Sequence, residues 1–214
     1  MPIKLPRPLV PLALIAALAG LCGCSGMLHS DQPPVEVYTL HAPRPAVPGG
    51  AASAAATLRL EPPVAGPGLG TARIVLLRPN HRMDHYAASA WSAEAPALIE
   101  ALAADTLKAS GAWRSVQGPG GAFPAQFMLE ISLRRFDADY APGAAAPTVR
   151  VALDCTVGTE ESRRILASFV ASGSQPAAAN RMRDVVAAFQ QATDAALRSL
   201  SHQTALAVRG QSGR

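Results

Sequence analysis

Hydrophobic and polar positions follow two periods along the chain, and the change between them separates strands from helices. Alternating or short apolar runs are typical of strands, whereas apolar residues at steps of three and four are typical of one helix face. The order of strands, one helix, more strands and one helix predicts an α+β fold, with a mostly antiparallel sheet and both amphipathic helices packed on one face. Strands are predicted at 35–40, 58–60, 73–78, 84–91, 113–116, 127–133, 148–157 and 163–172.

Both predicted helices have an apolar stripe that would face the core. The first has Ser92 as N-cap, Pro96 in its first turn and Gly111 after its last turn. The second runs over about 179–205. The stripes consist of Ile99, Leu102, Ala103, Thr106, Leu107 and Ser110 in the first helix, and of Met182, Val185, Val186, Phe189, Ala192, Ala196 and Leu200 in the second.

The strand predicted at 127–133 changes its pattern at its end. Apolar residues occupy every second position up to Leu133, after which Arg134 and Arg135 precede an apolar Phe136. Either a β-bulge or a second buried face would explain this shift.

The N-terminus has the pattern of a bacterial signal peptide. Lys4 and Arg7 form a charged start, and the apolar run over 9–21 is too short to span a bilayer as a helix, which needs about 20 residues. The run ends in a sequence that resembles the bacterial lipobox, with an aliphatic residue and two small residues before a cysteine. It comprises Leu21, Cys22, Gly23 and Cys24. A plain signal peptide or a short membrane anchor is the alternative interpretation.

As a lipobox, this motif implies cleavage before Cys24 and attachment of a diacylglycerol and an N-acyl chain such as palmitate. More than one chain gives stable anchoring, because each buried CH₂ contributes about 0.8 kcal/mol. In Gram-negative lipoproteins an Asp after the cysteine commonly signals retention at the inner membrane. Here Ser25 follows, so that resemblance implies the outer membrane, facing the periplasm. The chain then divides into a signal peptide at 1–23, a lipidated tether at 24–34, a folded domain at 35–205 with a flexible insert at 42–56, and a disordered tail at 206–214.

Charge and composition narrow the classes of partner. The formal net charge is +4, and it falls to +2 when Lys4 and Arg7 leave with the signal peptide. Arginines are scattered rather than clustered with aromatic residues, so nucleic-acid binding is not expected. Weak attraction to anionic lipid headgroups stays open. Only 5% of the residues are aromatic, which argues against a large aromatic binding site.

Cys155 is the one cysteine of the expected mature chain besides Cys24, so no intramolecular disulfide is predicted. It falls on the same strand face as Val151, Leu153 and Val157. A buried, inert thiol is therefore favoured over a reactive nucleophile.

Few residues suggest chemistry. His81, Asp84 and His85 form the only metal-like cluster, and the i,i+4 spacing of the histidines would suit zinc on a helix. The segment is predicted as turn and strand, which separates the rings, so surface histidines are favoured. Asp137 and Asp139 face the same side of a strand end, without an implied pocket. We predict no metal, no further cofactor, no catalytic residue and no enzymatic activity.

Two aromatic residues near the joint between a strand and the first helix allow two interpretations. Tyr86 and Trp91 would line a lipid groove or pack into the core, and core packing is the commoner fate at such a joint.

Several short motifs occur in a characteristic order over about 35–200. They are Tyr38 and Leu40; Pro67, Gly68, Leu69, Thr71, Arg73 and Ile74; Tyr86 and Ala87; Trp91 before a helix with Pro96, Leu102 and Leu107; and Ser110, Gly111, Trp113 and Val116 before a long strand and a final amphipathic helix. Together with the Cys24 motif, this order resembles the ABC-type transport auxiliary lipoproteins, a family that includes PqiC-like outer-membrane components. The insert at 42–56 departs from compact members.

The resemblance implies a partner rather than a substrate. It predicts a non-enzymatic docking component of an ABC- or MCE-type intermembrane lipid transport system, with an MCE-domain protein or an ABC permease component as partner. It leaves a homo-oligomer open. The alternative is an independent lipid- or envelope-binding lipoprotein on the same scaffold, or a hydrolase.

Overall fold

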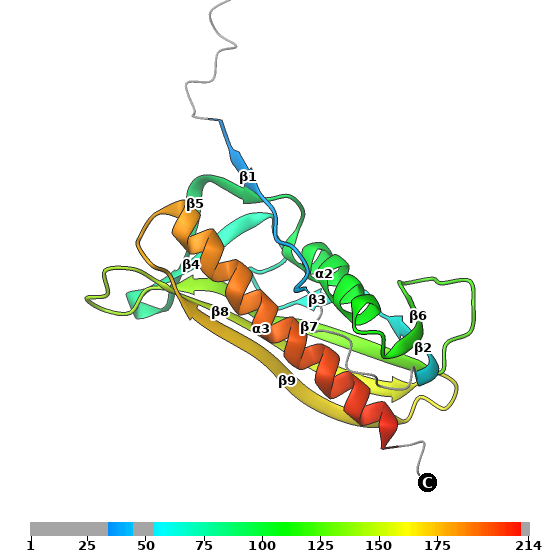
Figure 1. Ribbon diagram of the computed structural model, residues 1–214. Helices are drawn as coiled ribbons and strands as arrows, with labels where there is room; N and C mark the ends of the chain where they lie inside the picture. The colour runs from blue at the N-terminus through cyan, green and yellow to red at the C-terminus, as the bar shows by residue number, and fades with distance from the viewer. Residues whose placement is uncertain (1–33, 45–53, 211–214) are drawn as a thin grey trace, which may run out of the picture. The chain divides into compact units, whose positions relative to one another are not determined.

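The structure, a computed structural model, describes residues 34–44 and 54–210. The helices and strands of this part of the chain belong to one compact unit, Val35–Arg214 (Figure 1). In chain order they are β1 (Glu36–Tyr38), β2 (Ala54–Leu60), β3 (Val64–Ala65), β4 (Arg73–Arg78), a 3₁₀ turn (Pro79–His81), β5 (Arg82–Trp91), α2 (Ala95–Ala109), β6 (Trp113–Gln117), β7 (Phe127–Asp139), β8 (Thr148–Thr159), β9 (Ile165–Pro176) and α3 (Met182–Arg209).

Strand β7 is the centre of the sheet because other strands pair with both of its edges. On one edge it pairs antiparallel with β8, which in turn pairs antiparallel with β9. On the other edge β2, β3 and β4 follow one another, each parallel to β7. Beyond them β6 pairs with β2, and β5 pairs with β4 and then with β1.

The predicted α+β class with two helices is confirmed, and the long strands β7, β8 and β9 are antiparallel as expected. The short strands differ, because β2, β3 and β4 lie parallel to β7. Parallel neighbours need long crossover connections, and these bring residues far apart in the sequence to one strand edge.

The change of pattern at the end of the strand predicted at 127–133 is a β-bulge. Leu133 pairs with Leu153, whereas Arg135 pairs with Ala152, so Arg134 has no opposite residue in β8. The bulge returns Phe136 to the buried side, where it is 1% exposed.

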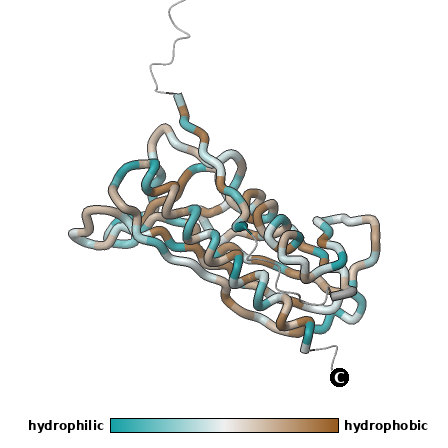
Figure 2. Tube along the Cα trace, in the orientation of Figure 1, coloured by the Kyte–Doolittle hydropathy of each residue, from teal (hydrophilic) through white to brown (hydrophobic). Residues whose placement is uncertain are grey.

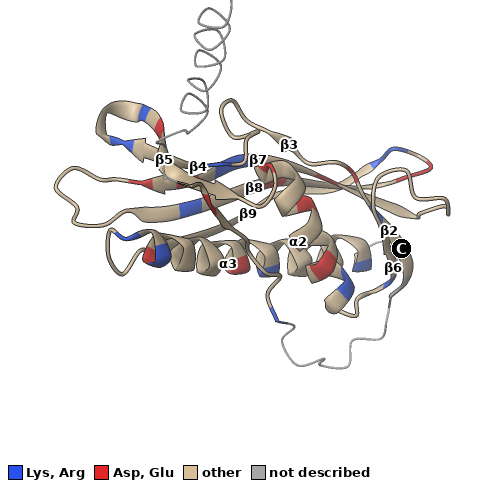
Figure 3. Ribbon diagram, turned by 90° about the horizontal axis from the view of Figure 1, so that it is seen from above, with Lys and Arg blue, Asp and Glu red and all other residues tan. Residues whose placement is uncertain are grey.

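Helices α2 and α3 cover the same face of the sheet (Figure 3). Their predicted stripes are buried, except that Ser110 is exposed and Met182 and Val186 are half-buried. Hydrophilic and hydrophobic positions alternate along α3 (Figure 2), and its buried apolar residues belong to the core. At the centre, Trp91, Phe136 and Phe189 form a cluster whose ring centroids lie 5.0–5.5 Å apart.

Two predicted helix boundaries are wrong. Ser92 does not cap α2: the N-cap is Glu94, without a side-chain cap, and the Ser92 hydroxyl donates to Thr39 Oγ1 at 3.2 Å. The tail predicted at 206–214 is helical as far as Arg209, because Val208 continues the buried stripe and is 4% exposed. Residues 211–214 lie outside the described residues.

The insert predicted at 42–56 is ordered at both of its described ends. Its last residues, from Ala54 onward, belong to β2, and Pro43 is buried. Just before it, His41 is held by α3: its backbone N–H donates to Gln190 Oε1 at 3.0 Å, and Gln190 Nε2 donates to His41 O at 2.8 Å. Residues 45–53 lie outside the described residues.

Candidate functional site

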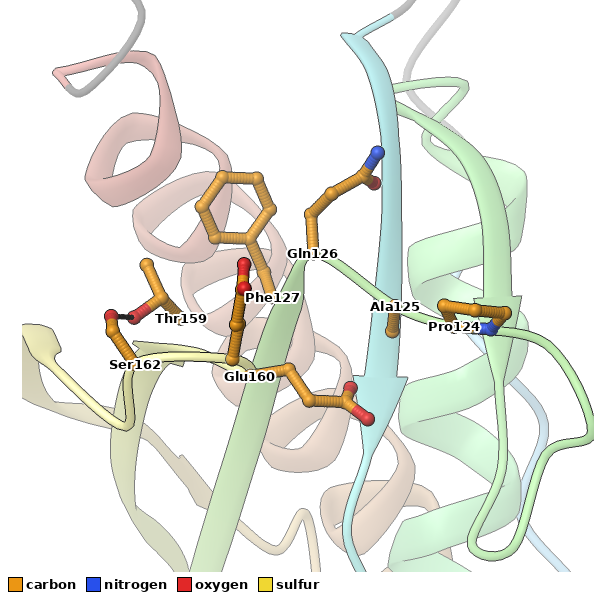
Figure 4. A pocket seen from close by; sticks show the side chains of 8 residues that line it. Pro124, Ala125, Gln126, Phe127, Thr159, Glu160 and Ser162 are labelled. Carbon is orange, nitrogen blue, oxygen red and sulfur yellow. Dashed lines mark hydrogen bonds between the residues drawn. The ribbon is translucent and has the colours of Figure 1, made fainter.

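A pocket of about 600 Å³ opens where β7 begins and β8 ends. Two segments line it, 124–127 and 159–162, and they meet because Phe127 pairs with Thr159 across the two strands. Figure 4 shows the Phe127 ring rising from the start of β7, with Thr159 and the residues after it on one side and Pro124 and Ala125 on the other.

The two segments are tied together by their backbones and by β2. Glu160 N–H donates to Gln126 O at 3.0 Å. On its other side Gln126 binds β2 twice: its N–H donates to Thr57 O at 3.1 Å, and its side-chain oxygen accepts from Thr57 N–H at 2.5 Å. The pocket is therefore built on the sheet rather than on free loops.

Arg59 of β2 fixes the surrounding loops with a single guanidinium group. Its side chain is 16% exposed; Nε donates to Glu160 Oε2 at 3.1 Å, and Nη2 lies 3.0 Å from Glu160 Oε1. Nη1 donates to Gly121 O at 3.3 Å and Nη2 to Phe123 O at 3.1 Å. Arg59 thereby holds the loop between β6 and β7 against the turn between β8 and β9.

Phe123 lies in the loop over 118–126, called here the Phe123 loop. Its side chain is 75% exposed, the highest value among the exposed large apolar side chains of the described residues. Its backbone is held on both sides, because Phe123 N–H donates to Gln117 Oε1 at 3.4 Å and Phe123 O accepts from Arg59. A large apolar side chain thus faces solvent on a restrained backbone.

The polar side chains of the pocket are the Gln126 amide, two carboxylates and two hydroxyls. Glu160 is paired with Arg59, whereas Glu161 has no ion-pair partner within the described part of the chain. The hydroxyls of Thr159 and Ser162 lie 2.5 Å apart, and Thr159 Oγ1 also accepts from Arg164 N–H at 3.2 Å. The lining contains no His, Cys or Lys. Such a site can bind a molecule that has an apolar group next to a positively charged group. Its lining holds no nucleophile paired with a base.

The pocket and the entry of the chain into the domain lie in different parts of the sheet. The chain enters through β1, which pairs with β5, next to β4. The pocket lies at the Phe127 end of β7, and β4 pairs with the opposite end, near Asp139 (Figure 1). A 13-residue strand such as β7 spans about 43 Å.

The residues predicted as a metal-like cluster do not converge. His81 lies in the 3₁₀ turn and is exposed, and His85 lies in β5. Asp84 is occupied by other groups: it accepts from His85 N–H at 2.9 Å and from Arg78 Nε at 3.1 Å, which lowers its pKa. In the described ranges, no group of three or more His, Cys, Asp and Glu could hold a metal ion.

Asp137 and Asp139 face the same side of β7, as predicted, and form a ladder with arginines. Arg135 donates to both oxygens of Asp137 at 3.1 and 2.8 Å and to Asp139 at 3.1 Å. Arg150 donates to Asp139 at 3.1 Å. These bonds raise the pKa of Arg135, chiefly through Asp137. Each carboxylate accepts from an arginine, so the ladder is an element of stability.

Trp91 belongs to the interior, and Tyr86 is partly buried and packs against the core. Trp91 is 2% exposed in the aromatic cluster. The Tyr86 hydroxyl lies 2.9 Å from that of Tyr140, which donates to Asn180 Oδ1 at 2.7 Å. Burial and the bond to Tyr140 raise the pKa of Tyr86.

The thiol of Cys155 is buried, as predicted. It is 1% exposed, and burial raises its pKa to about 12. Leu21, Cys22, Gly23 and Cys24 lie outside the described residues, so lipidation of Cys24 stays a prediction.

Arg59, the Phe123 loop and the pocket were not predicted from the sequence. One local signal was present: Phe123 is an apolar residue between a glycine-rich turn, Gly118 to Gly121, and Pro124. The pairing of Arg59 with Glu160 had no such signal, because 101 positions separate them.

Comparisons with known proteins agree with this fold. A family model described as an ABC-type transport auxiliary lipoprotein component matches residues 38–201. The crystal structure of protein XCC0632 from Xanthomonas campestris is similar with a TM-score of 0.73 and 23% identity, over 83% of this chain and 100% of that one. An uncharacterized protein of known structure has a TM-score of 0.62 at 10% identity, over 80% of this chain and 99% of that one.

These two structures show the fold alone, since their identities are low. No curated protein matches the sequence. Among the described helices, none is both long and apolar enough to cross a bilayer.

Proposed function

Because the chain belongs to the family of ABC-type transport auxiliary lipoprotein components, we propose that it is a lipid-anchored docking component of a transport system that moves lipids or related hydrophobic molecules between two membranes. Its partner would be an MCE-domain protein, an ABC permease component, or both. It would act from the periplasmic side of the outer membrane. The domain would bind and position its partner and would not catalyse a reaction.

The observation that carries this proposal is the family match over 38–201, which reaches from the end of β1 into α3. It includes every strand from β2 to β9. The family is one of auxiliary components, and the pocket lining lacks a nucleophile paired with a base, which fits binding better than catalysis.

The proposed anchor is the diacylglycerol and N-acyl chain on Cys24, after removal of 1–23. Metabolic labelling with an acyl-chain analogue tests it: Cys24→Ala is expected to abolish labelling, and undiminished labelling of that variant would contradict the anchor. The outer-membrane location rests on Ser25, so Ser25→Asp is expected to move the protein to the inner-membrane fraction. An unchanged distribution would remove that argument.

Affinity purification from detergent-solubilised membranes tests the docking role. The tagged full chain is expected to co-purify with an MCE-domain protein or a permease component, identified by mass spectrometry. Cys24→Ala is the matched control for the contribution of the anchor. Repeated purification without either partner would contradict docking.

The pocket favours a second candidate, an independent lipid- or envelope-binding lipoprotein. Its volume of about 600 Å³ falls within the range of small-ligand sites, roughly 300–1,000 Å³. This candidate predicts lipid in the purified protein and no transport partner, so the same purification separates the two functions.

A further inference from the structure

We propose that the Phe123 loop and the adjoining pocket form the surface on which the protein partner docks, and that the partner contributes a segment with an apolar side chain next to a lysine or arginine. This inference rests on the proposed function, because it assumes a protein partner. It adds the place of contact and the chemistry of the segment bound there.

The loop is pre-organised for binding. Arg59 holds the carbonyl oxygens of Gly121 and Phe123 and, at the same time, the carboxylate of Glu160. Gln117 accepts from Phe123 N–H on the other side. A loop that is already ordered loses little conformational entropy when a partner covers it, so more of the contact energy appears as affinity.

Phe123 supplies the apolar anchor of this surface. Its side chain is 75% exposed, and the next residue, Pro124, begins the pocket lining. Ala125 and Phe127 continue the apolar lining from there. Aromatic side chains on ordered backbone are typical of the few interface residues that contribute most to binding. A partner side chain in the pocket would therefore lie beside Phe123.

The charged side chains at the pocket indicate which kind of partner residue would fit beside it. Glu160 is neutralised by Arg59, which leaves Glu161 as a carboxylate with no ion-pair partner in the described domain. Arg163 and Arg164 are exposed two and three residues later, but neither lines the pocket. A lysine or arginine of the partner would complement Glu161 at the rim.

The docking surface and the point where the chain enters the domain lie in different parts of the sheet. The chain enters the domain through β1, in the part of the sheet that holds β4 and β5, whereas the Phe123 loop precedes β7 at the opposite end of that strand (Figure 1). The chain thus enters the domain away from this surface.

Purification of the full chain with its MCE-domain or permease partner tests the inference. Phe123→Ala and Glu161→Lys are each expected to reduce recovery of the partner at least about tenfold, whereas Phe123→Tyr is expected to retain it. Matched controls are Val170→Ala, an exposed apolar residue of β9, and Asp105→Lys, an exposed acid of α2. Both should leave recovery unchanged. Thermal unfolding checks that all variants fold.

Replacement of Phe123 by a photo-crosslinking phenylalanine identifies the occupant directly. A crosslink to the MCE-domain protein or permease supports the inference, and a crosslink to a second copy of this chain or to lipid overturns it. If the wild type captures its partner and Phe123→Ala captures it equally well, the inference is wrong while the proposed function stands. If the wild type captures neither partner, the proposed function fails and the inference fails with it.

Discussion

Gly173 of β9 packs directly against the backbone of Ala192 in α3: a β-carbon on Gly173 would lie 1.9 Å from the carbonyl oxygen of Ala192. Strand and helix can approach this closely only because Gly173 has no side chain. Relief of the clash would require α3 to move away from β8 and β9, whose apolar residues it covers.

Gly173→Ala is therefore expected to lower the free energy of unfolding by about 2 kcal/mol or more, the cost of overpacking a rigid contact. Denaturant unfolding followed by circular dichroism measures the change. Gly118→Ala is the matched control, because a β-carbon there meets nothing within 4 Å. Equal stabilities of the two variants would show that α3 does not pack on β9 as described.

Arg59 is predicted to order the Phe123 loop. Arg59→Met keeps much of the aliphatic stem but removes the guanidinium bonds to Gly121, Phe123 and Glu160. We expect a loss of roughly 1–3 kcal/mol in stability and faster amide hydrogen exchange in the Phe123 loop.

The control for this variant is Arg134→Met. Arg134 pairs with Asp154 at 3.1 Å, but the two side chains are 58% and 44% exposed. Exposed pairs contribute about 0–1 kcal/mol, so this change should leave exchange in the Phe123 loop unaltered. Exchange that responds equally to both variants would mean that Arg59 has no special role.

Cys155 is predicted to make stability depend on pH in the alkaline range. Burial raises the pKa of its thiol from 9.0 to about 12 in the folded protein. Below pH 9 both states keep the proton, and the thiol adds no pH dependence. Above it the unfolded chain ionises first, so the free energy of unfolding falls until the folded thiol also ionises near pH 12.

Urea unfolding at several values between about pH 8 and pH 11 measures this effect. Cys155→Ala removes the thiol, and its stability is expected to fall less steeply with pH than that of the wild type. Parallel curves would contradict a buried, protonated Cys155.

The C-terminal end of α3 is predicted to contribute to stability, because Val208 continues its buried stripe. Val208 is 4% exposed and Leu206 is 51% exposed. Val208→Ala should cost about 1–2 kcal/mol, and Leu206→Ala should change stability by less than about 0.5 kcal/mol. Equal, negligible effects would mean that the helix ends before Val208.

The strands and helices of this domain were largely predictable because their signals are local. Alternation located β7 and the change of pattern after Leu133, for which a bulge was one of two explanations. The three- and four-residue steps located the buried stripes of α2 and α3. A predicted helix boundary is wrong where a side chain binds a residue distant in the sequence instead of the nearby backbone. The Ser92 hydroxyl, for example, donates to Thr39 and does not cap α2.

The candidate site was not predictable because it depends on contacts between distant segments. Arg59 lies between Leu58 and Leu60, where alternation indicates only an outward-facing side chain. Its role appears once β2 pairs with β7 and brings Arg59 to Glu160. The parallel pairing of β2, β3 and β4 with β7 has no local signature either, since it depends on long crossovers.

Reciprocal purification tests whether this lipoprotein docks a transport component. An MCE-domain protein or permease component from the same cells is tagged, solubilised from membranes and purified, and the bound lipoprotein is quantified by mass spectrometry. The wild-type chain is expected to be recovered with the tagged component, and Phe123→Ala is expected to be recovered at least about tenfold less. Absence of the wild-type chain from every such preparation, while it remains abundant in the membranes, would show that it does not dock this component.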